Sequence, residues 1–266
     1  MRYQNRVLVS FDGICPMKCK HCYTYELNLA SKNRSIDQIV LDLNDKKFDV
    51  IYLSQSYENF FDEKKGIELV RKLYDCYQKD IFIITRSYLT DYSILELVKI
   101  SHKMKEKGNK LILAVSICGD KSYGRTENID VCPTPELRLS NLERAYKAGI
   151  QTILLLRPIF PDNVIPIQEC IDVIQKAHNY VCSVISSGLI VTDEIISRLN
   201  LRKDNLKILS HGNSEYLDNL DREKVKYLDV SKELDLIRGK CELLNLPFFS
   251  HSMPALNYLA TAYEAQ

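Results

Sequence analysis

The chain has 266 residues, of which 45% are hydrophobic, and carries a formal net charge of +1 at pH 7. This composition is ordinary for a globular protein with a substantial core, and the small charge argues against the global basic field that nucleic-acid binders often show. No apolar run is long enough to cross a bilayer, and the N-terminus lacks the features of a signal peptide. The odd cysteine count, nine, adds to the expectation of a cytoplasmic protein with no membrane contact.

Short apolar runs alternate with amphipathic segments through most of the chain. The runs are apolar throughout, as strands in a sheet covered by helices are; they span residues 6–11, 50–54, 81–85, 111–117, 152–156 and 181–185. The segments between them carry helix signals, such as the N-cap residue Ser35 and the Thr134-Pro135-Glu136 start of a later helix. Glycines at 108 and 149 follow two of these helices.

Six β/α steps of this kind predict parallel strands wound right-handed. We therefore expect an α/β fold, a partial (β/α)6 TIM-type barrel rather than a closed eightfold one. In β/α barrels the chemistry lies on loops at the carboxyl ends of the strands. Residues that follow the expected strands are therefore the first candidates for a site.

The pattern changes near Ile195. We expect residues 1–195 to form the partial barrel and residues 196–266 to form a helical and coil extension that caps it within the same domain. In this extension, a long charged helix is predicted with apolar residues Val225, Leu228, Leu234, Ile237 and Cys241. Residues 247–254, which include two prolines, are predicted to be coil or a short strand.

Three cysteines, Cys15, Cys19 and Cys22, lie within eight positions directly after the first expected strand. Thiolates are soft ligands that select iron–sulfur clusters, zinc or copper(I). An iron–sulfur cubane bound by protein thiolates alone normally takes four cysteines. Three cysteines would leave one iron open to a chelating small molecule.

Two other interpretations of this loop stay open. Structural zinc usually has four ligands, and His21 would be the fourth only if the tight loop folded back on itself. The spacing can also arise by chance, because free cysteine is often buried as a small hydrophobe. The remaining cysteines form no second paired motif, so we expect most to be structural thiols: Cys76, Cys118, Cys132, Cys170, Cys182 and Cys241.

The Cys-x3-Cys-x2-Cys spacing after a first strand resembles the signature of the radical S-adenosylmethionine (radical SAM) enzymes. The resemblance implies that Cys15, Cys19 and Cys22 hold a [4Fe–4S] cluster whose fourth iron is chelated by SAM. It also implies cleavage of SAM to methionine and a 5′-deoxyadenosyl radical, which takes hydrogen from a substrate. The motif does not identify that substrate; we expect a small molecule or a peptide, and a reducing partner such as flavodoxin or ferredoxin.

SAM has a charged amino-acid part, a ribose and an adenine, so polar residues at strand ends are candidates to bind it. Ser54 and Ser56 follow the second strand, where many members of the resembled family have a Gly-Gly-Glu-Pro segment that holds the methionyl amine. This chain lacks those glycines; either serine can accept from the amine instead, with Glu58 as a helper. Arg86 ends the third strand, and its guanidinium can hold the SAM carboxylate with two parallel hydrogen bonds.

The other candidates lie on later strands and in the cysteine loop. Ser116 suits a ribose hydroxyl, and Arg157 can contact adenine or substrate. In the family pattern, His21 offers its main chain to the edge of the adenine. Tyr23 and Tyr57 are candidate catalytic residues, as radical relays, with simple packing as the alternative for each.

The stretch from Val115 to Pro158 is similar to the branch of the superfamily that contains spore photoproduct lyase. The resemblance implies a cysteine after the second strand as hydrogen-atom donor, but here the segment is Ser54-Gln55-Ser56. Nucleic-acid repair or modification is therefore an alternative rather than the favoured function. It predicts a basic groove formed by Lys18, Lys20, Arg86, Arg125 and Arg157. A non-catalytic zinc-binding protein is the other alternative.

Overall fold

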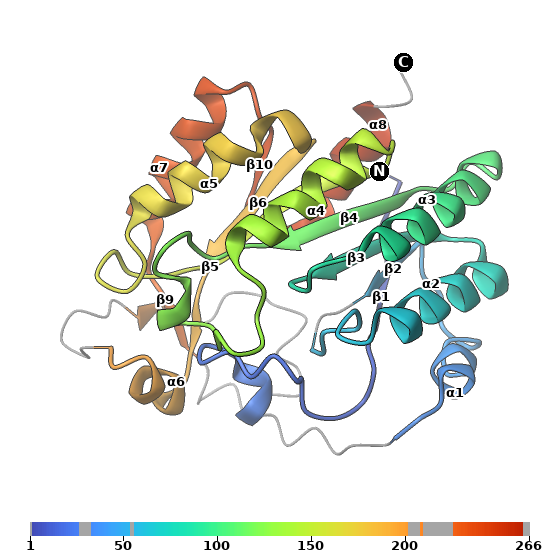
Figure 1. Ribbon diagram of the computed structural model, residues 1–266, viewed down its shortest axis with the longest axis horizontal. Helices are drawn as coiled ribbons and strands as arrows, with labels where there is room; N and C mark the ends of the chain where they lie inside the picture. Colours follow the sequence, from blue (N-terminus) through green and yellow to red (C-terminus); the bar gives the residue numbers. More distant parts are fainter. Residues whose placement is uncertain (1, 27–32, 54–55, 202–207, 210–225, 263–266) are drawn as a thin grey trace.

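The computed structural model describes residues 2–26, 33–53, 56–201, 208–209 and 226–262. Its main feature is an open sheet of seven parallel strands in the order β1-β2-β3-β4-β5-β6-β10 (Figure 1). The strands are β1 (Arg6–Val9), β2 (Val50–Leu53), β3 (Asp80–Thr85), β4 (Leu111–Ser116), β5 (Gln151–Ile159), β6 (Ser183–Gly188) and β10 (Phe248–Phe249). This architecture confirms the expected α/β fold with an open, barrel-like sheet.

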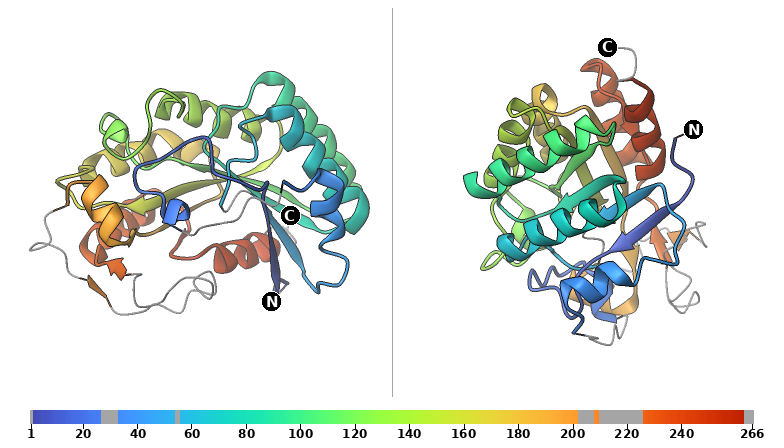
Figure 2. Two further views of the ribbon diagram at one scale, coloured as in Figure 1. Left: turned by 90° about the horizontal axis from the view of Figure 1, so that it is seen from below. Right: turned by 90° about the vertical axis from the view of Figure 1, so that its right-hand side faces the viewer.

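The crossover helices lie on one face of this sheet (Figures 1 and 2). They are α1 (Ile36–Leu41), α2 (Glu63–Tyr77), α3 (Asp91–Glu106), α4 (Pro135–Lys147), α5 (Ile167–Ala177) and α7 (Ser231–Leu243). Ser35 caps α1 in a capping box with Gln38, and Thr134 caps α4 before Pro135, as their sequence signals predict. Among the helices that the structure describes, none is both long and apolar enough to span a bilayer.

Side chains alternate between the two faces of the sheet, so each strand contributes to two separate cores. On β4, for example, Leu113 and Val115 belong to the large core under the helices. Ile112 and Ala114 point to the other face and pack against a single helix, α8 (Ser252–Ala262). Figure 2 shows α8 on the face of the sheet opposite α2 and α3.

The C-terminal part differs from its prediction in three places. Leu228 lies in strand β9 (Lys226–Leu228), and the helix expected around it begins only at Ser231, as α7 (Ser231–Leu243). Val225, expected in the same helix, lies outside the described residues. Strand β9 pairs antiparallel with β7 (Ile190–Val191) and β8 (Ile208–Leu209), and α6 (Asp193–Arg198) follows β7. Residues 252–254, predicted as coil, begin α8 because a proline is tolerated in the first turn of a helix. Within residues 247–254, predicted as coil or a short strand, Phe248–Phe249 form the short strand β10.

Candidate active site

The cysteine loop follows β1 and is joined to the loop that follows β4. The backbone amide of Lys20 donates to the carbonyl of Thr126 (2.9 Å), and the His21 ring bonds to the same carbonyl through Nδ1 (3.0 Å). Figure 1 shows the two loops together beyond the carboxyl ends of the strands. The loop therefore lies at the edge of the sheet where β/α barrels place their chemistry.

The three motif cysteines pack in one small cluster around Met17. Cys19 is buried, and Cys15 and Cys22 are half-buried. The hydrogen bond with the Cys132 thiol and the Arg86 guanidinium hold the pKa of Cys19 at about 7 in spite of its burial, whereas burial raises the pKa of Cys15 to about 11. Cys19 therefore ionises more readily than Cys15. The thiolate is the form of cysteine that binds metals.

Three cysteine thiolates are a donor set whose chemistry fits an iron–sulfur cluster. In the part of the chain that the structure describes, no three side chains of the Cys, His, Asp or Glu type are arranged to hold one ion. Cysteine thiolates are the usual ligands of [4Fe–4S] clusters. His21 is an unsuitable zinc ligand as it stands, because Nδ1 bonds to Thr126 and Nε2 lies 3.2 Å from Arg86 Nη1.

Arg86 occupies the centre of the site, directly after β3. Its Nη1 lies 3.1 Å from Cys19 Sγ, and its Nη2 donates to Ser116 Oγ (2.9 Å) and lies 3.5 Å from Cys118 Sγ. The side chain is only 13% exposed. The structure therefore brings together three residues that the sequence analysis selected separately: Arg86, Cys19 and Ser116.

Two buried carboxylates support Arg86. The sequence analysis gave Glu127 no role and placed Glu58 at the methionyl amine instead. Glu127 lies 3.5 Å from Arg86 and forms a bidentate ion pair with Arg138, and both members of that pair are 0% exposed. Glu58, also buried, accepts from the Arg86 backbone amide (2.7 Å) and from Thr85 Oγ1 (2.8 Å). Burial raises the pKa of Glu58 despite these hydrogen bonds.

The alternation of strand residues explains why these polar side chains meet. Ile84 and Ala114 face α8, and Arg86 and Ser116 come two residues after them on the same face. Leu155 on β5 and Ile185 on β6 likewise precede Arg157 and Ser187, whose side chains bond through Nε and Oγ (2.7 Å). The inner face is therefore apolar where α8 covers it and polar toward the carboxyl ends of the strands.

The remaining candidates lie around this centre. The Arg157 carbonyl accepts from Ser116 Oγ (3.4 Å) and Cys118 Sγ (3.2 Å), while its side chain turns toward β6. Ser56 Oγ lies 2.8 Å from Ser10 Oγ after β1. Ser54 lies outside the described residues, so its role stays a prediction.

His21 and Tyr57 each pack edge-on against a neighbouring aromatic ring. The His21 ring packs edge-on against Phe160 at 5.3 Å, and burial together with nearby Arg86 lowers its pKa to about 3. The imidazole is therefore neutral near neutral pH. Tyr57 packs edge-on against Phe11 at 5.9 Å, and Tyr23 packs against the large core. Burial, then nearby Cys15, raises the pKa of Tyr57. The role of each tyrosine as a radical relay stays a prediction.

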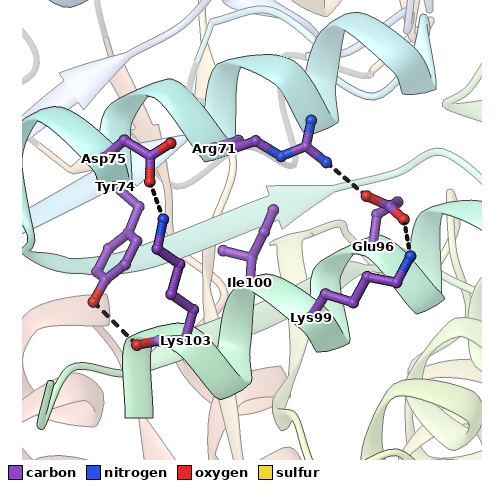
Figure 3. Close-up of a pocket in the computed structure, with 7 residues that line it drawn as sticks. All are labelled: Arg71, Tyr74, Asp75, Glu96, Lys99, Ile100 and Lys103. Carbon is purple, nitrogen blue, oxygen red and sulfur yellow. Dashed lines mark hydrogen bonds and ion pairs between the residues drawn. The ribbon is translucent and has the colours of Figure 1, made fainter. Parts of the chain in front are cut away.

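A separate hollow lies in the outer helical layer, between α2 and α3 (Figure 3). Its charged side chains neutralise one another through the pairs Arg71–Glu96, Lys99–Glu96 and Lys103–Asp75, each at 2.6 Å. These residues come from beyond the first turns of their helices, away from the loops that follow the strands. The hollow is therefore not part of the candidate active site.

Comparisons with known proteins bear on the fold. No protein-family model and no curated protein matches the sequence. Among solved structures, the chain is similar to a mutant of spore photoproduct lyase with bound AdoMet and dinucleoside spore photoproduct, with a TM-score of 0.62 and 12% identity over 91% of this chain and 75% of that one. A further mutant of the lyase gives a TM-score of 0.64 at 10% identity, over 91% of this chain and 75% of that one.

A third structure, the lyase complexed with dinucleoside spore photoproduct, gives a TM-score of 0.61 at 12% identity, over 90% of this chain and 74% of that one. Each similarity extends over most of both chains, although few residues are identical. The chain therefore shares its fold with spore photoproduct lyase.

Proposed function

We propose that the protein is a radical SAM enzyme that acts on a small-molecule or peptide substrate. The observation that carries this proposal is the cluster of Cys15, Cys19 and Cys22 beside Arg86, at the carboxyl ends of the strands of a partial barrel. A structure with the same fold holds AdoMet. Because three cysteines would leave one iron of a [4Fe–4S] cluster without a thiolate, the loop suits a cluster that SAM completes.

In this proposal the bound cluster supplies the electron that cleaves SAM to methionine and a 5′-deoxyadenosyl radical. Cys15, Cys19 and Cys22 hold the cluster. Arg86 binds the carboxylate of SAM, because its guanidinium offers parallel donors that match a carboxylate. Glu58 and Glu127 fix the backbone and the side chain of Arg86 before SAM arrives.

The other SAM contacts follow from the residues around Arg86. Ser116 is proposed to bind a ribose hydroxyl, and the backbone near His21 and Arg157 the adenine. Ser56, with Ser54, is proposed to accept from the methionyl amine. Tyr23 and Tyr57 remain candidate relays, and a flavodoxin or ferredoxin remains the proposed electron donor.

The cluster itself is tested by metal analysis of protein purified without oxygen. The proposal predicts a brown protein with iron and acid-labile sulfide in equal amounts, about four of each per chain. The Cys19→Ala variant should lose most of both, whereas Cys76→Ala should retain them because Cys76 is exposed and outside the cluster. Zinc without sulfide would support the zinc-binding alternative and contradict the proposal.

Repair or modification of nucleic acid is the second candidate, favoured by the similarity to a lyase complexed with a dinucleoside. Four of the five residues predicted to form a basic groove already bond to other groups of the chain: Lys20, Arg86, Arg125 and Arg157. Arg86 lies in the buried network, and Arg125 lies 3.4 and 3.3 Å from the carbonyl oxygens of Asn163 and Val164. Oligonucleotide binding at low salt tests this candidate, and the absence of measurable affinity would count against it.

A further inference from the structure

Three exposed basic side chains lie on and beside the cysteine loop. Lys18 and Lys20 flank the buried Cys19 in sequence, and both are exposed. Arg125, also exposed, lies in the loop after β4, which the Lys20 backbone amide joins through the Thr126 carbonyl. Positive charge is therefore concentrated beside a motif cysteine, on a chain whose net charge is only +1.

Hydrogen bonds hold two of these side chains without neutralising them. Lys20 Nζ donates to the Gly124 carbonyl (3.0 Å), and Arg125 Nη1 lies 3.4 and 3.3 Å from two backbone carbonyl oxygens after β5. A carbonyl oxygen carries no full charge, so these bonds order the cations and leave their field to act on a partner. In residues 14–20 and 124–131, Asp130 is the one exposed acid against the three exposed bases.

An exposed isoleucine lies among these charges. Ile129 is 62% exposed. It lies against Gly124, because a Cβ on that glycine would be 2.6 Å from Ile129 Cγ2, and the Gly124 carbonyl is the one that Lys20 binds. Two residues later, Val131 packs against the cysteine cluster. We define the basic patch as four residues: Lys18, Lys20, Arg125 and Ile129.

We propose that the basic patch is the docking surface for an acidic electron-carrier protein that reduces the cluster. This inference rests on the proposed function, in which cleavage of SAM consumes one electron. One electron passes from the reduced carrier to the cluster, the carrier is oxidised by one electron, and no bond forms or breaks in the transfer. Since Lys18 and Lys20 adjoin Cys19, a carrier docked on them is separated from the cluster by little more than the cysteine loop.

The composition of the patch favours a protein partner over nucleic acid. Protein interfaces combine an apolar centre with a polar rim, and electron-transfer complexes are small, which suits one isoleucine among three cations. Opposite charges on the two proteins would speed their encounter. Most contacts to nucleic acid go to phosphate and sugar, for which an exposed isoleucine supplies no hydrogen-bond donor.

The first experiment measures binding of two acidic carriers, a flavodoxin and a [2Fe–2S] ferredoxin, to the cluster-loaded protein by isothermal titration calorimetry. At least one carrier should bind wild type at low salt, with an affinity that falls as salt is added. Lys18→Glu/Lys20→Glu should raise the Kd about tenfold, and Ile129→Ser about fivefold. Lys105→Glu is the control and should bind normally, because Lys105 is exposed in the last turn of α3, near the start of β4.

The second experiment separates docking from the chemistry of the site. Dithionite is a small reductant that needs no protein docking surface. Patch variants that are fully reduced with excess dithionite should therefore release as much 5′-deoxyadenosine from SAM as wild type, and they should release less when a reduced carrier is the only electron source. Iron and sulfide analysis confirms that each variant is loaded, and circular dichroism confirms that it is folded.

The outcomes separate the two proposals. A dithionite-reduced cluster that leaves SAM intact would overturn the proposed function and this inference with it. If SAM is cleaved but neither carrier binds, or both carriers bind the patch variants as tightly as wild type, the inference alone is overturned. An oligonucleotide that binds wild type in place of both carriers, and is lost from Lys18→Glu/Lys20→Glu, would assign the patch to nucleic acid and also overturn it.

Discussion

Arg86 is the residue on which most of the candidate site converges. It lies beside Cys19, Ser116 and His21, and Glu127 is near enough to balance its charge. Because these contacts already order the guanidinium, it can bind an incoming carboxylate with little further loss of side-chain entropy. Arg86 is thus positioned to bind the carboxylate of SAM, the proposed cofactor.

Replacement of Arg86 by Gln should weaken SAM binding by about tenfold to a hundredfold, because a charged hydrogen bond contributes about 1.5–3 kcal/mol. Arg86→Lys should bind with intermediate affinity, since it retains the charge and loses the fork of donors. Equilibrium dialysis with the cluster-loaded protein measures the effect. Arg71→Gln, in the outer layer, is the control and should bind normally. Equal affinity in Arg86→Gln and wild type would contradict the role given to Arg86.

Glu127 should contribute to stability in a pH-dependent way. Burial alone would raise its pKa, but Arg86 and Arg138 outweigh burial and hold the pKa below its usual value of 4.5. A carboxylate with a depressed pKa stabilises the folded state above its unfolded pKa, and this contribution is lost as the pH falls through the folded value. Glu127→Gln should cost about 3 kcal/mol at pH 7 because the buried Arg138 loses its counter-charge.

Chemical denaturation of wild type and Glu127→Gln across the pH range tests this prediction. The difference in free energy of unfolding should be largest near neutral pH and should shrink below pH 4.5. The surface variant Glu143→Gln should leave stability nearly unchanged, since its partner Lys147 is largely exposed. A difference between wild type and Glu127→Gln that stays constant down to low pH would contradict the assigned ionisation.

Sequence alone indicated part of the residue-level site. The cysteine spacing and the polar residues at strand ends selected Cys19, Arg86 and Ser116, because period-two alternation and parallel order bring such positions together. It did not assign roles to Glu127, Arg138 or Cys132. These residues lie in the loop after β4 or on α4, and their contacts with β3 and the cysteine loop depend on tertiary packing that no local pattern encodes.

At the level of elements, α8 determines how the inner face of the sheet is divided. Its apolar residues recur at helical spacing and cover the part of that face away from the cysteine loop: Ala255, Leu256, Leu259 and Ala260. Asn257 on the same helix bonds to the backbone of Tyr3 through both its amide oxygen (2.9 Å) and its amide nitrogen (3.1 Å). The C-terminal helix thereby joins the start of the chain to the barrel interior.

Leu256→Ala should lower the free energy of unfolding by about 2–5 kcal/mol, because the fully buried side chain leaves a cavity between α8 and the sheet. Thr261→Ala, on the exposed side of the same helix, should change it by less than about 0.5 kcal/mol. Thermal or urea unfolding compares the two. Equal small losses would show that α8 does not support the sheet.

The success of prediction also differed among the elements. Strands β2 to β5 and the caps of α1 and α4 were predicted near their observed places, because long apolar runs and capping residues act locally. Helix α8 was missed because Pro247 and Pro254 lie on either side of its first residue and indicate coil. Its apolar stripe is stabilised by packing on the sheet, which local propensity does not show. Leu228 was placed in a helix because a short apolar run does not distinguish strand from helix.

At the level of the whole molecule, the helical layers stabilise the sheet, and the candidate site lies outside them, at the carboxyl ends of the strands. Helices α2 to α5 cover one face of the sheet and α8 covers part of the other (Figure 2). What these layers leave at the carboxyl ends of the strands is the polar region around Arg86 and the motif cysteines. The fold thus gives the cysteine loop a rigid base, which suits a cofactor that must be positioned against a substrate.

The proposed chemistry is tested most directly by the product that SAM cleavage would release. Protein reconstituted with iron and sulfide under anaerobic conditions is reduced with dithionite, given SAM, and assayed for 5′-deoxyadenosine. The wild-type protein should release it, and Cys19→Ala should not. A wild-type protein that holds a reduced cluster and leaves SAM intact would contradict the claim that this barrel performs radical SAM chemistry.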